Sequence, residues 1–165
     1  MGESIRKADS ILQERQDSDM RAVRFSILGE PKAKGRPRFA KRGNFVTTYT
    51  PEETLNYEAF IKMRYLEAAN GTVFDGAVEA EINCVFGIPK STSKKKKQEM
   101  IDGHIPCMKR PDTDNIAKSI LDSINTIAYK DDSQVVKLTV TKMYGEIPRV
   151  DVIIKDWEKK KCITN

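Results

Sequence analysis

The sequence predicts an α+β fold: a single domain in which a mixed β-sheet is packed by helices. Its 165 residues, of which 39% are hydrophobic, suit one core of moderate size. Short stretches alternate apolar with polar residues and longer ones repeat apolar residues at helical spacing. In chain order these stretches read strand, helix, strand, helix, helix and two strands, with no internal repeat and no linker.

The first part of the domain is predicted to hold one strand and an irregular basic segment. Apolar residues at positions 23, 25 and 27 alternate with polar ones, which indicates a strand. Residues 31–43 combine glycine, proline and many cations, so we expect a loop or a loose hairpin, and residues 45–49 are expected to be a short extended piece.

A long helix is predicted to follow this segment. Thr50 can serve as the N-cap, Pro51 as the first helical residue, and Asn70-Gly71 is expected to end the helix after Ala69. Apolar residues recur along it at helical spacing, so we expect them to pack on the core. This stripe consists of Leu55, Ala59, Met63 and Leu66.

The second half contains the clearest strand pattern, over residues 78–86, and then two predicted helices. The first is lysine-rich and runs over about residues 93–102. The second begins at Asp114, as its cap, and carries apolar residues on one side. Two strands, over 136–140 and 150–154, are expected to place their apolar residues on the same face, with Gly145 allowing the turn between them.

These boundaries divide the chain into a charged N-terminal extension (1–20), a folded domain (21–157) and a basic tail (158–165). The three cysteines are too few and too far apart for a disulfide framework or a zinc site, and the single His104 leaves no imidazole pair for zinc. No apolar run reaches membrane length, and the N-terminus lacks the apolar core of a signal peptide. We therefore expect a cytoplasmic protein with reduced cysteines and no membrane partner.

The charge of the chain favours a polyanionic partner. Twenty-nine lysines and arginines against twenty-four acids give a net charge of +5. One group of cations, in a glycine- and proline-containing segment with interleaved phenylalanines, suits contacts to DNA phosphates. These predicted DNA-binding residues are Lys32, Lys34, Arg36, Arg38, Lys41 and Arg42. The run of lysines at 94–97 is less specific, because such runs are usually solvated helix faces.

Within this basic chain, acids cluster between residues 112 and 132. Asp112 and Asp114, two residues apart at a helix start, can present their carboxylates together, and Lys118 follows Asp114 by one helical turn. Asp131-Asp132 lies at the entrance of the next strand. Carboxylates this close repel one another unless a cation lies between them, and Mg²⁺ prefers such hard oxygen ligands.

The chemistry that this cluster suits best is cleavage of a phosphodiester. A bound Mg²⁺ can activate water and stabilise the leaving oxygen, while Lys118 can supply a point charge to the transition state. The same residues also admit a purely structural interpretation, in which Asp114 caps a helix and Asp131-Asp132 forms a turn. Asp122, one turn beyond Lys118, is expected to be its salt-bridge partner.

Several of these segments together resemble the RusA family of crossover junction endodeoxyribonucleases. The resemblance is carried by residues 109–118, 121–122 and 131–135, with support from the segments 31–38 and 49–51, and it covers roughly residues 22–155. It makes residues 21–157 a RusA-like nuclease domain and implies a phage- or prophage-type homodimer. Such a protein resolves four-way (Holliday) DNA junctions by paired nicks in recombination and repair.

The resemblance also implies roles for single residues and a cofactor. Asp112, Asp114 and Asp132 match the essential acids of the family, which makes them catalytic residues and metal ligands, and Lys118 matches its essential lysine. Asp131 matches a neighbouring acid, so a part in metal binding is left open for it. The implied cofactor is Mg²⁺, with Mn²⁺ as a substitute and no organic cofactor, and the implied partner is branched DNA in the bacterial cytosol or nucleoid.

Two rival functions fit parts of the sequence. A non-catalytic DNA-binding or junction-binding protein with the same fold would use the basic segment alone. A nucleotidyl or nucleotide-sugar transferase would use the D-x-D motif to hold a metal-bound diphosphate, but that class usually has a larger nucleotide-binding domain, and the chain has neither G-x-G-x-x-G nor a P-loop.

Overall fold

The main sheet of the protein has four strands. The computed structural model describes residues 20–35, 38–42 and 45–158, and of residues 38–42 and 45–49 only the backbone. The strands are β1 (Ala22–Leu28), β4 (Val78–Gly87), β5 (Val135–Gly145) and β6 (Arg149–Asp156), in the order β1-β6-β4-β5. Strand β6 is antiparallel to both of its neighbours and β4 is parallel to β5, so the predicted mixed sheet is confirmed.

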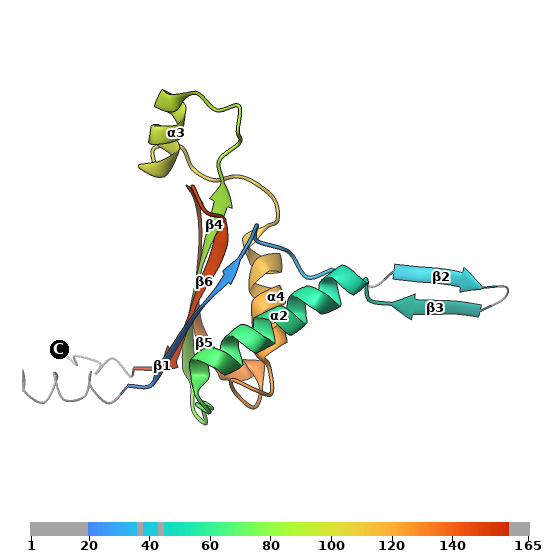
Figure 1. Cartoon of the computed structure of the whole chain (residues 1–165). Coiled ribbons are helices and arrows are strands. Elements are labelled where there is room, and N and C mark those ends of the chain that lie inside the picture. Colours follow the sequence, from blue (N-terminus) through green and yellow to red (C-terminus); the bar gives the residue numbers. More distant parts are fainter. Residues whose placement is uncertain (1–19, 36–37, 43–44, 159–165) are drawn as a thin grey trace, which may run out of the picture.

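Two helices, α2 (Glu52–Ala69) and α4 (Thr113–Ile124), pack against the sheet on the same side of it, and α3 (Lys94–Ile101) lies beyond the end of β4 (Figure 1). Strand residues that alternate along β1, β4 and β6 meet these helices in a single core, which confirms the α+β prediction. No described helix combines the length and the apolar character needed to cross a membrane.

The basic segment forms a hairpin that projects from the body of the protein (Figure 1). Strands β2 (Arg38–Arg42) and β3 (Phe45–Tyr49) pair with each other in antiparallel register, from Arg38 opposite Tyr49 to Arg42 opposite Phe45, and form a separate two-stranded sheet. The prediction of a hairpin here is therefore confirmed. The hairpin leads directly into the first turn of α2.

The last two strands are not neighbours, which corrects the predicted arrangement. Strand β4 lies between β5 and β6, and β5 pairs with β4 alone. Because β5 is an edge strand, Val136 and Leu138 stay exposed rather than joining the core. A register shift between Val78 and Glu79 also interrupts the pairing opposite Val136.

The face of the sheet that carries no helix is charged and cross-linked by ion pairs. Glu79 of β4 lies 2.6 Å from the ammonium of Lys137 on β5, and Lys155 of β6 lies 3.1 Å from Glu81. The hydrogen bond from Lys137 lowers the pKa of Glu79, although burial of this carboxylate acts in the opposite direction. These pairs replace apolar contacts on a face that water reaches.

The prediction for the packed face of α2 is wrong. The helix turns Ile61, Tyr65 and Ala69 to the core, and it leaves Leu55, Met63 and Leu66 exposed. Tyr65 makes an edge-to-face contact with Phe25 of β1, with ring centroids 5.8 Å apart. Both sides of α2 are apolar, so spacing alone could not identify the side that packs.

This correction can be tested by comparing one residue from each side of α2. We expect Ile61→Ala to lower the free energy of unfolding by about 2–5 kcal/mol, because it opens a cavity in the core. Leu66→Ala should change the same quantity in the monomer by less than about 0.5 kcal/mol. Urea denaturation at low protein concentration measures both, and equal losses would contradict the observed packing.

Candidate active site

Three of the predicted site residues lie at or near the start of α4. Asp112 is the N-cap, with extended backbone (φ −72°, ψ 153°), so helical residues begin at Thr113 and not after Asp114 as predicted. Asp114 lies in the first turn and Lys118 one turn further along, and all three side chains are exposed. Asp112 makes no capping hydrogen bond, so its carboxylate stays available for other ligands.

Asp112, Asp114 and Asp132 differ from the other aspartates in the described part of the chain. The carboxylates of Asp75, Asp102, Asp122, Asp131, Asp151 and Asp156 each accept a hydrogen bond or ion pair from another residue. Within the described ranges no such bond reaches the carboxylates of the other three, and the ammonium of Lys118 likewise has no carboxylate partner there. The residues predicted for catalysis are thus the ones that the fold leaves unengaged.

Lys142 of β5 holds the segment that leads into α4. Its ammonium donates to the backbone carbonyls of Lys109 and, at 3.1 Å, of Pro111, the residue before Asp112. It also lies 5.4 Å from the ring centroid of Phe86, a cation–π distance. A half-buried charge with these partners holds the helix start in position, and no local pattern in the sequence predicts this contact.

The second acidic segment is held by a capping box. Asp131 is the N-cap of a short 3₁₀ turn, Asp132–Gln134, and accepts from the backbone N–H of Ser133 at 2.9 Å. Hydrogen bonds from Ser133 lower the pKa of Asp131. The Gln134 side chain accepts from the N–H groups of Lys130 and Asp131, and its amide donates to the carbonyl of Gly76 at 2.7 Å. The carboxylate of Asp131 is therefore engaged in a hydrogen bond, whereas that of Asp132 accepts none from the described residues.

The structure does not bring Asp132 next to Asp112 and Asp114. Asp132 lies just before the start of β5. Lys142, which binds the carbonyl of Pro111, lies seven residues after the first residue of that strand. The backbone positions of Asp132 and Lys142 are therefore on the order of 20 Å apart along the strand. The hydroxyl of the buried Tyr129 donates to the carbonyl of Leu121, which ties the Asp132 segment to the second half of α4. Burial raises the pKa of Tyr129 strongly, and the charges of Asp132 and Asp122 raise it further.

The donor chemistry of the site suits a hard cation, although the acids are not gathered around one point. In residues 20–35, 38–42 and 45–158 no three histidine, cysteine, aspartate or glutamate side chains stand close enough together to hold a metal ion. Mg²⁺ commonly takes only one or two carboxylates, and completes its shell with water and phosphate oxygens. Asp112 and Asp114 supply this number of carboxylates at the start of α4.

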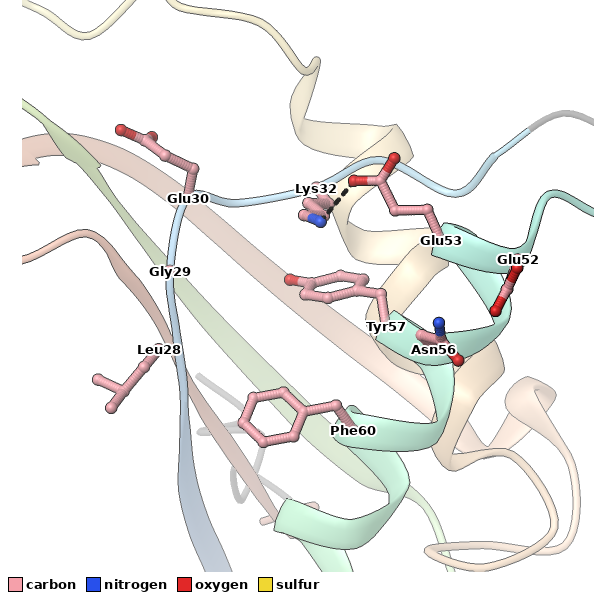
Figure 2. A pocket seen from close by; sticks show the side chains of 9 residues that line it. All are labelled: Leu28, Gly29, Glu30, Lys32, Glu52, Glu53, Asn56, Tyr57 and Phe60. Carbon is pink, nitrogen blue, oxygen red and sulfur yellow. Dashed lines mark hydrogen bonds and ion pairs between the residues drawn. The ribbon is translucent and has the colours of Figure 1, made fainter.

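Two of the predicted DNA-binding lysines make ion pairs within the protein. Lys32 lies 2.6 Å from Glu53 at the start of α2 (Figure 2), and Lys34 pairs with Asp122 of α4. The prediction that Asp122 pairs with Lys118 is therefore wrong. The backbone N–H of Lys34 also donates to the carbonyl of Asn115 at 3.3 Å, so the segment before the hairpin is fastened to the start of α4.

The other predicted cations lie in the hairpin or on α3. Arg36 lies outside the described residues, and the structure describes only the backbone of Arg38, Lys41 and Arg42, which all belong to β2. On α3, the side chains at positions 94–96 are exposed, while Lys97 pairs with Glu146 at 2.7 Å. The last contact attaches α3 to the turn between β5 and β6.

Comparison with known proteins supports the family suggested by these residues. The family model described as "Endodeoxyribonuclease RusA" matches residues 29–155. The chain belongs to the RusA endodeoxyribonuclease family. It is also 36% identical over 139 residues to "Uncharacterized protein YqaN" of Bacillus subtilis (strain 168), an alignment that covers 83% of this chain and 98% of that protein. The RusA resemblance is thus confirmed, and with it membership of a nuclease family that acts on branched DNA.

In this RusA-family protein, the contacts of Gln134 yield a testable prediction. Gln134→Ala removes both the acceptor of the capping box and the donor to Gly76, so the turn that carries Asp132 should loosen. If Asp132 takes part in cleavage, the DNA cleavage rate should fall by about tenfold or more, with DNA affinity unchanged. Gel-based cleavage and binding assays measure the two quantities separately.

The matched control is Gln98→Ala, which removes an exposed hydrogen bond to Asp102 on α3. It should leave the cleavage rate within about twofold of the unmodified protein. Equal rates for the two variants would show that the Asp132 turn has no part in cleavage.

Proposed function

We propose that this RusA-family protein is a Mg²⁺-dependent endonuclease that resolves four-way DNA junctions by paired nicks in the bacterial cytosol. The observation that carries the proposal is the match of a RusA endodeoxyribonuclease model to residues 29–155, together with the unengaged state of the residues that match its motif. Asp112 at the N-cap of α4, and Asp114 and Lys118 within the helix, are all exposed, so a DNA strand can reach them.

Asp112 and Asp114 would hold the metal ion, with Mn²⁺ as a substitute for Mg²⁺. A bound ion supplies the activation of water and the stabilisation of charge on the leaving oxygen. Lys118, one turn beyond Asp114, is placed to bind a phosphate oxygen and to stabilise the negative charge that develops there. Because no carboxylate among the described residues neutralises Lys118, its full charge is available to DNA.

The basic segment before α2 would grip the DNA backbone. Lys32 and Lys34 each have a carboxylate partner in the structure, so a phosphate must compete with Glu53 or Asp122 for them. Exposed ion pairs are weak, and this competition costs little. The hairpin strand that contains Arg38, Lys41 and Arg42 projects from the body of the protein (Figure 1), so a DNA arm that lies along the hairpin would meet this segment.

A non-catalytic junction-binding protein is the second candidate function. It is favoured by one observation, namely that the described acids are not gathered around a common point. Incubation with a labelled mobile four-way junction, in Mg²⁺ and separately in EDTA, decides between the two. Nicks on opposing strands that appear in Mg²⁺ but not in EDTA support the nuclease. Binding without nicks in both conditions supports the alternative.

The metal role predicts a separation of binding from cleavage. Asp114→Asn keeps the shape of the side chain but removes a charged ligand, so we expect cleavage to fall by at least about 100-fold. Junction binding should stay within about threefold, since removal of an acid does not weaken phosphate contacts. Cleavage and electrophoretic mobility shift assays check the two expectations.

Two control variants make this result specific. Asp102→Asn alters an exposed aspartate that pairs with Gln98 and should leave cleavage unchanged. Asp131→Asn keeps an oxygen acceptor for Ser133 in the turn before β5, away from the proposed metal ligands, so it should have a much smaller effect than Asp114→Asn. Unchanged cleavage by Asp114→Asn would rule out the proposed metal role.

The DNA-binding role of the hairpin predicts a change in salt dependence. Replacement of Arg38, Lys41 and Arg42 by Gln should lower the slope of log K against log salt concentration by about 3, because each phosphate contact contributes about 0.9. The effect should be similar for any DNA sequence. Fluorescence anisotropy between about 50 and about 200 mM salt measures the slope. An unchanged slope would place the DNA elsewhere on the protein.

A further inference from the structure

Strand β5 carries a lysine in a row of side chains that face the core. Val140 and Tyr144, on either side of Lys142 in this row, are partly buried and pack against the core. Lys142 is also the register partner of Cys84, a core residue of β4, so its aliphatic stem starts on the packed side of the sheet. A charge at such a position is costly unless it finds partners, so the presence of a lysine here requires an explanation.

Both hydrogen-bond acceptors of Lys142 lie in the segment through which the chain enters α4. They are the carbonyls of Lys109 and Pro111, on either side of Arg110. An ammonium group has three donors, so one side chain can hold two carbonyls of a segment with which no described strand pairs. The charge makes each bond stronger than a bond between neutral groups. Lys142 thus serves residues 109–111 as the N–H groups of a neighbouring strand would.

A second lysine fastens the same segment to the end of β4. The ammonium of Lys109 donates to the carbonyl of Gly87 at 3.2 Å and lies 3.6 Å from a carboxylate oxygen of Glu30. Lys109 and Lys142 lie 5.5 and 5.4 Å from the ring centroid of Phe86, so both ammonium groups are at a cation–π distance from one ring. The segment is therefore held from β4 as well as from β5, and it ends one residue before the N-cap of α4.

We propose that Lys142 is a positioning residue for the metal ion, because it sets where Asp112 lies relative to Asp114. The inference rests on the proposed function, in which the carboxylates of these two residues hold Mg²⁺. Lys142 acts through the backbone of the segment that it holds and not through contact with the ion or with DNA. Its role is thus distinct from that of Lys118, which is placed to bind a phosphate oxygen.

The two carboxylates differ in what holds them. Asp114 lies in the first turn of α4, so the helix itself fixes its backbone. Asp112 precedes the helix. Its carbonyl accepts from the N–H of Ile116 at 3.1 Å, but its side chain makes no capping hydrogen bond. The amino side of Asp112, and with it the direction of its side chain, therefore depends on Pro111, which Lys142 holds.

The geometry that Mg²⁺ requires makes this support important. The ion takes its ligands in a near-octahedral arrangement at about 2.1 Å, so a small displacement of one carboxylate weakens binding. Removal of a group that orients a metal ligand typically costs about 10- to 100-fold in metal affinity or activity. The loss of the Lys142 ammonium should therefore weaken metal binding itself, and not only the stability of the fold.

The variant Lys142→Met tests the proposal, because methionine keeps most of the aliphatic stem on the packed side of β5 and removes the ammonium. Binding of Mn²⁺ to the protein without DNA, measured by electron paramagnetic resonance, should weaken by about tenfold or more. The Mg²⁺ concentration that gives half of the maximal cleavage rate should rise by a similar factor. Junction binding in EDTA should stay within about threefold, since Lys142 contacts no phosphate in this proposal.

Two further variants separate positioning from general stability. Lys137→Met, on the same strand, removes the ion pair with Glu79 on the face that carries no helix, and it should leave the Mn²⁺ affinity within about twofold. Lys142→Arg restores a charged donor, although the planar guanidinium differs in shape from an ammonium, so it should recover at least about half of the loss on a logarithmic scale. A role in stability alone would lower the urea midpoint of Lys142→Met and leave its Mn²⁺ affinity unchanged.

Amide hydrogen exchange follows the segment directly. In Lys142→Met, peptides that contain residues 105–112 should exchange faster than in the unmodified protein, because two of the bonds that hold them are lost. Faster exchange together with weaker Mn²⁺ binding supports the proposal, even if the protein cleaves no junction. Unchanged exchange, or faster exchange with unchanged Mn²⁺ affinity, overturns it.

Comparison with Asp114→Asn separates failure of this proposal from failure of the proposed function. If Asp114→Asn abolishes Mn²⁺ binding and Lys142→Met leaves it unchanged, the metal role of the aspartates is supported and the positioning role of Lys142 is overturned. An unmodified protein that binds no Mn²⁺ overturns both.

Discussion

The burial of one face of the mixed sheet beneath α2 and α4 is the constraint on which the rest of the structure depends. Alternate residues of β1, β4 and β6 are apolar and need a cover, and these two helices supply it. The position of α4 follows, because Ile116, Ile120 and Ile124 must face the sheet. That orientation leaves Asp114 and Lys118 on the outer side, so the packing of the core determines where the chemistry can occur.

The acidic side chains of the described residues fall into two sets, those that make an ion pair or hydrogen bond and those that make none. Most described acids are paired, including Asp122 with Lys34 and Glu53 with Lys32. The exceptions lie at the start of α4, in the turn before β5 and at a few exposed glutamates. A net charge of +5 gives the molecule a general attraction for polyanions, while the unpaired Asp112 and Asp114 leave negative charge without a partner at the start of α4.

The sequence predicted what depends on local pattern and failed where distant segments meet. Strand alternation predicted the strands, and residues Thr50–Glu53 predicted the start of the long helix, with nearly correct bounds. At that helix start the prediction was off by one residue, because Pro51 and not Thr50 is the N-cap. Local pattern could not show that β4 inserts between β5 and β6. It could not show which apolar side of α2 is buried either, because that depends on the surface that the helix meets.

The same distinction applies to the site. The spacing of Asp112, Asp114 and Lys118 predicted that they lie near one another in the chain's fold, and the structure has Asp112 as the N-cap of α4 and the other two within its first two turns. The sequence pattern did not predict the position of Asp132. Its turn ends before β5 begins, so the expected strand alternation does not reach this residue. The lysine of the Lys34–Asp122 pair lies 88 residues from its partner, a distance at which sequence patterns give no information.

The dependence of the site on β5 has a consequence for how the protein loses activity. This strand is held by β4 on one side only, yet Lys142 in its second half and Gln134, in the turn just before it, fasten both acidic segments. Edge strands separate from a sheet at a lower free energy than the whole domain unfolds. Fraying of this one border would therefore release both acidic segments while the core beneath α2 stays folded, so these segments would lose their positions on heating before the domain melts.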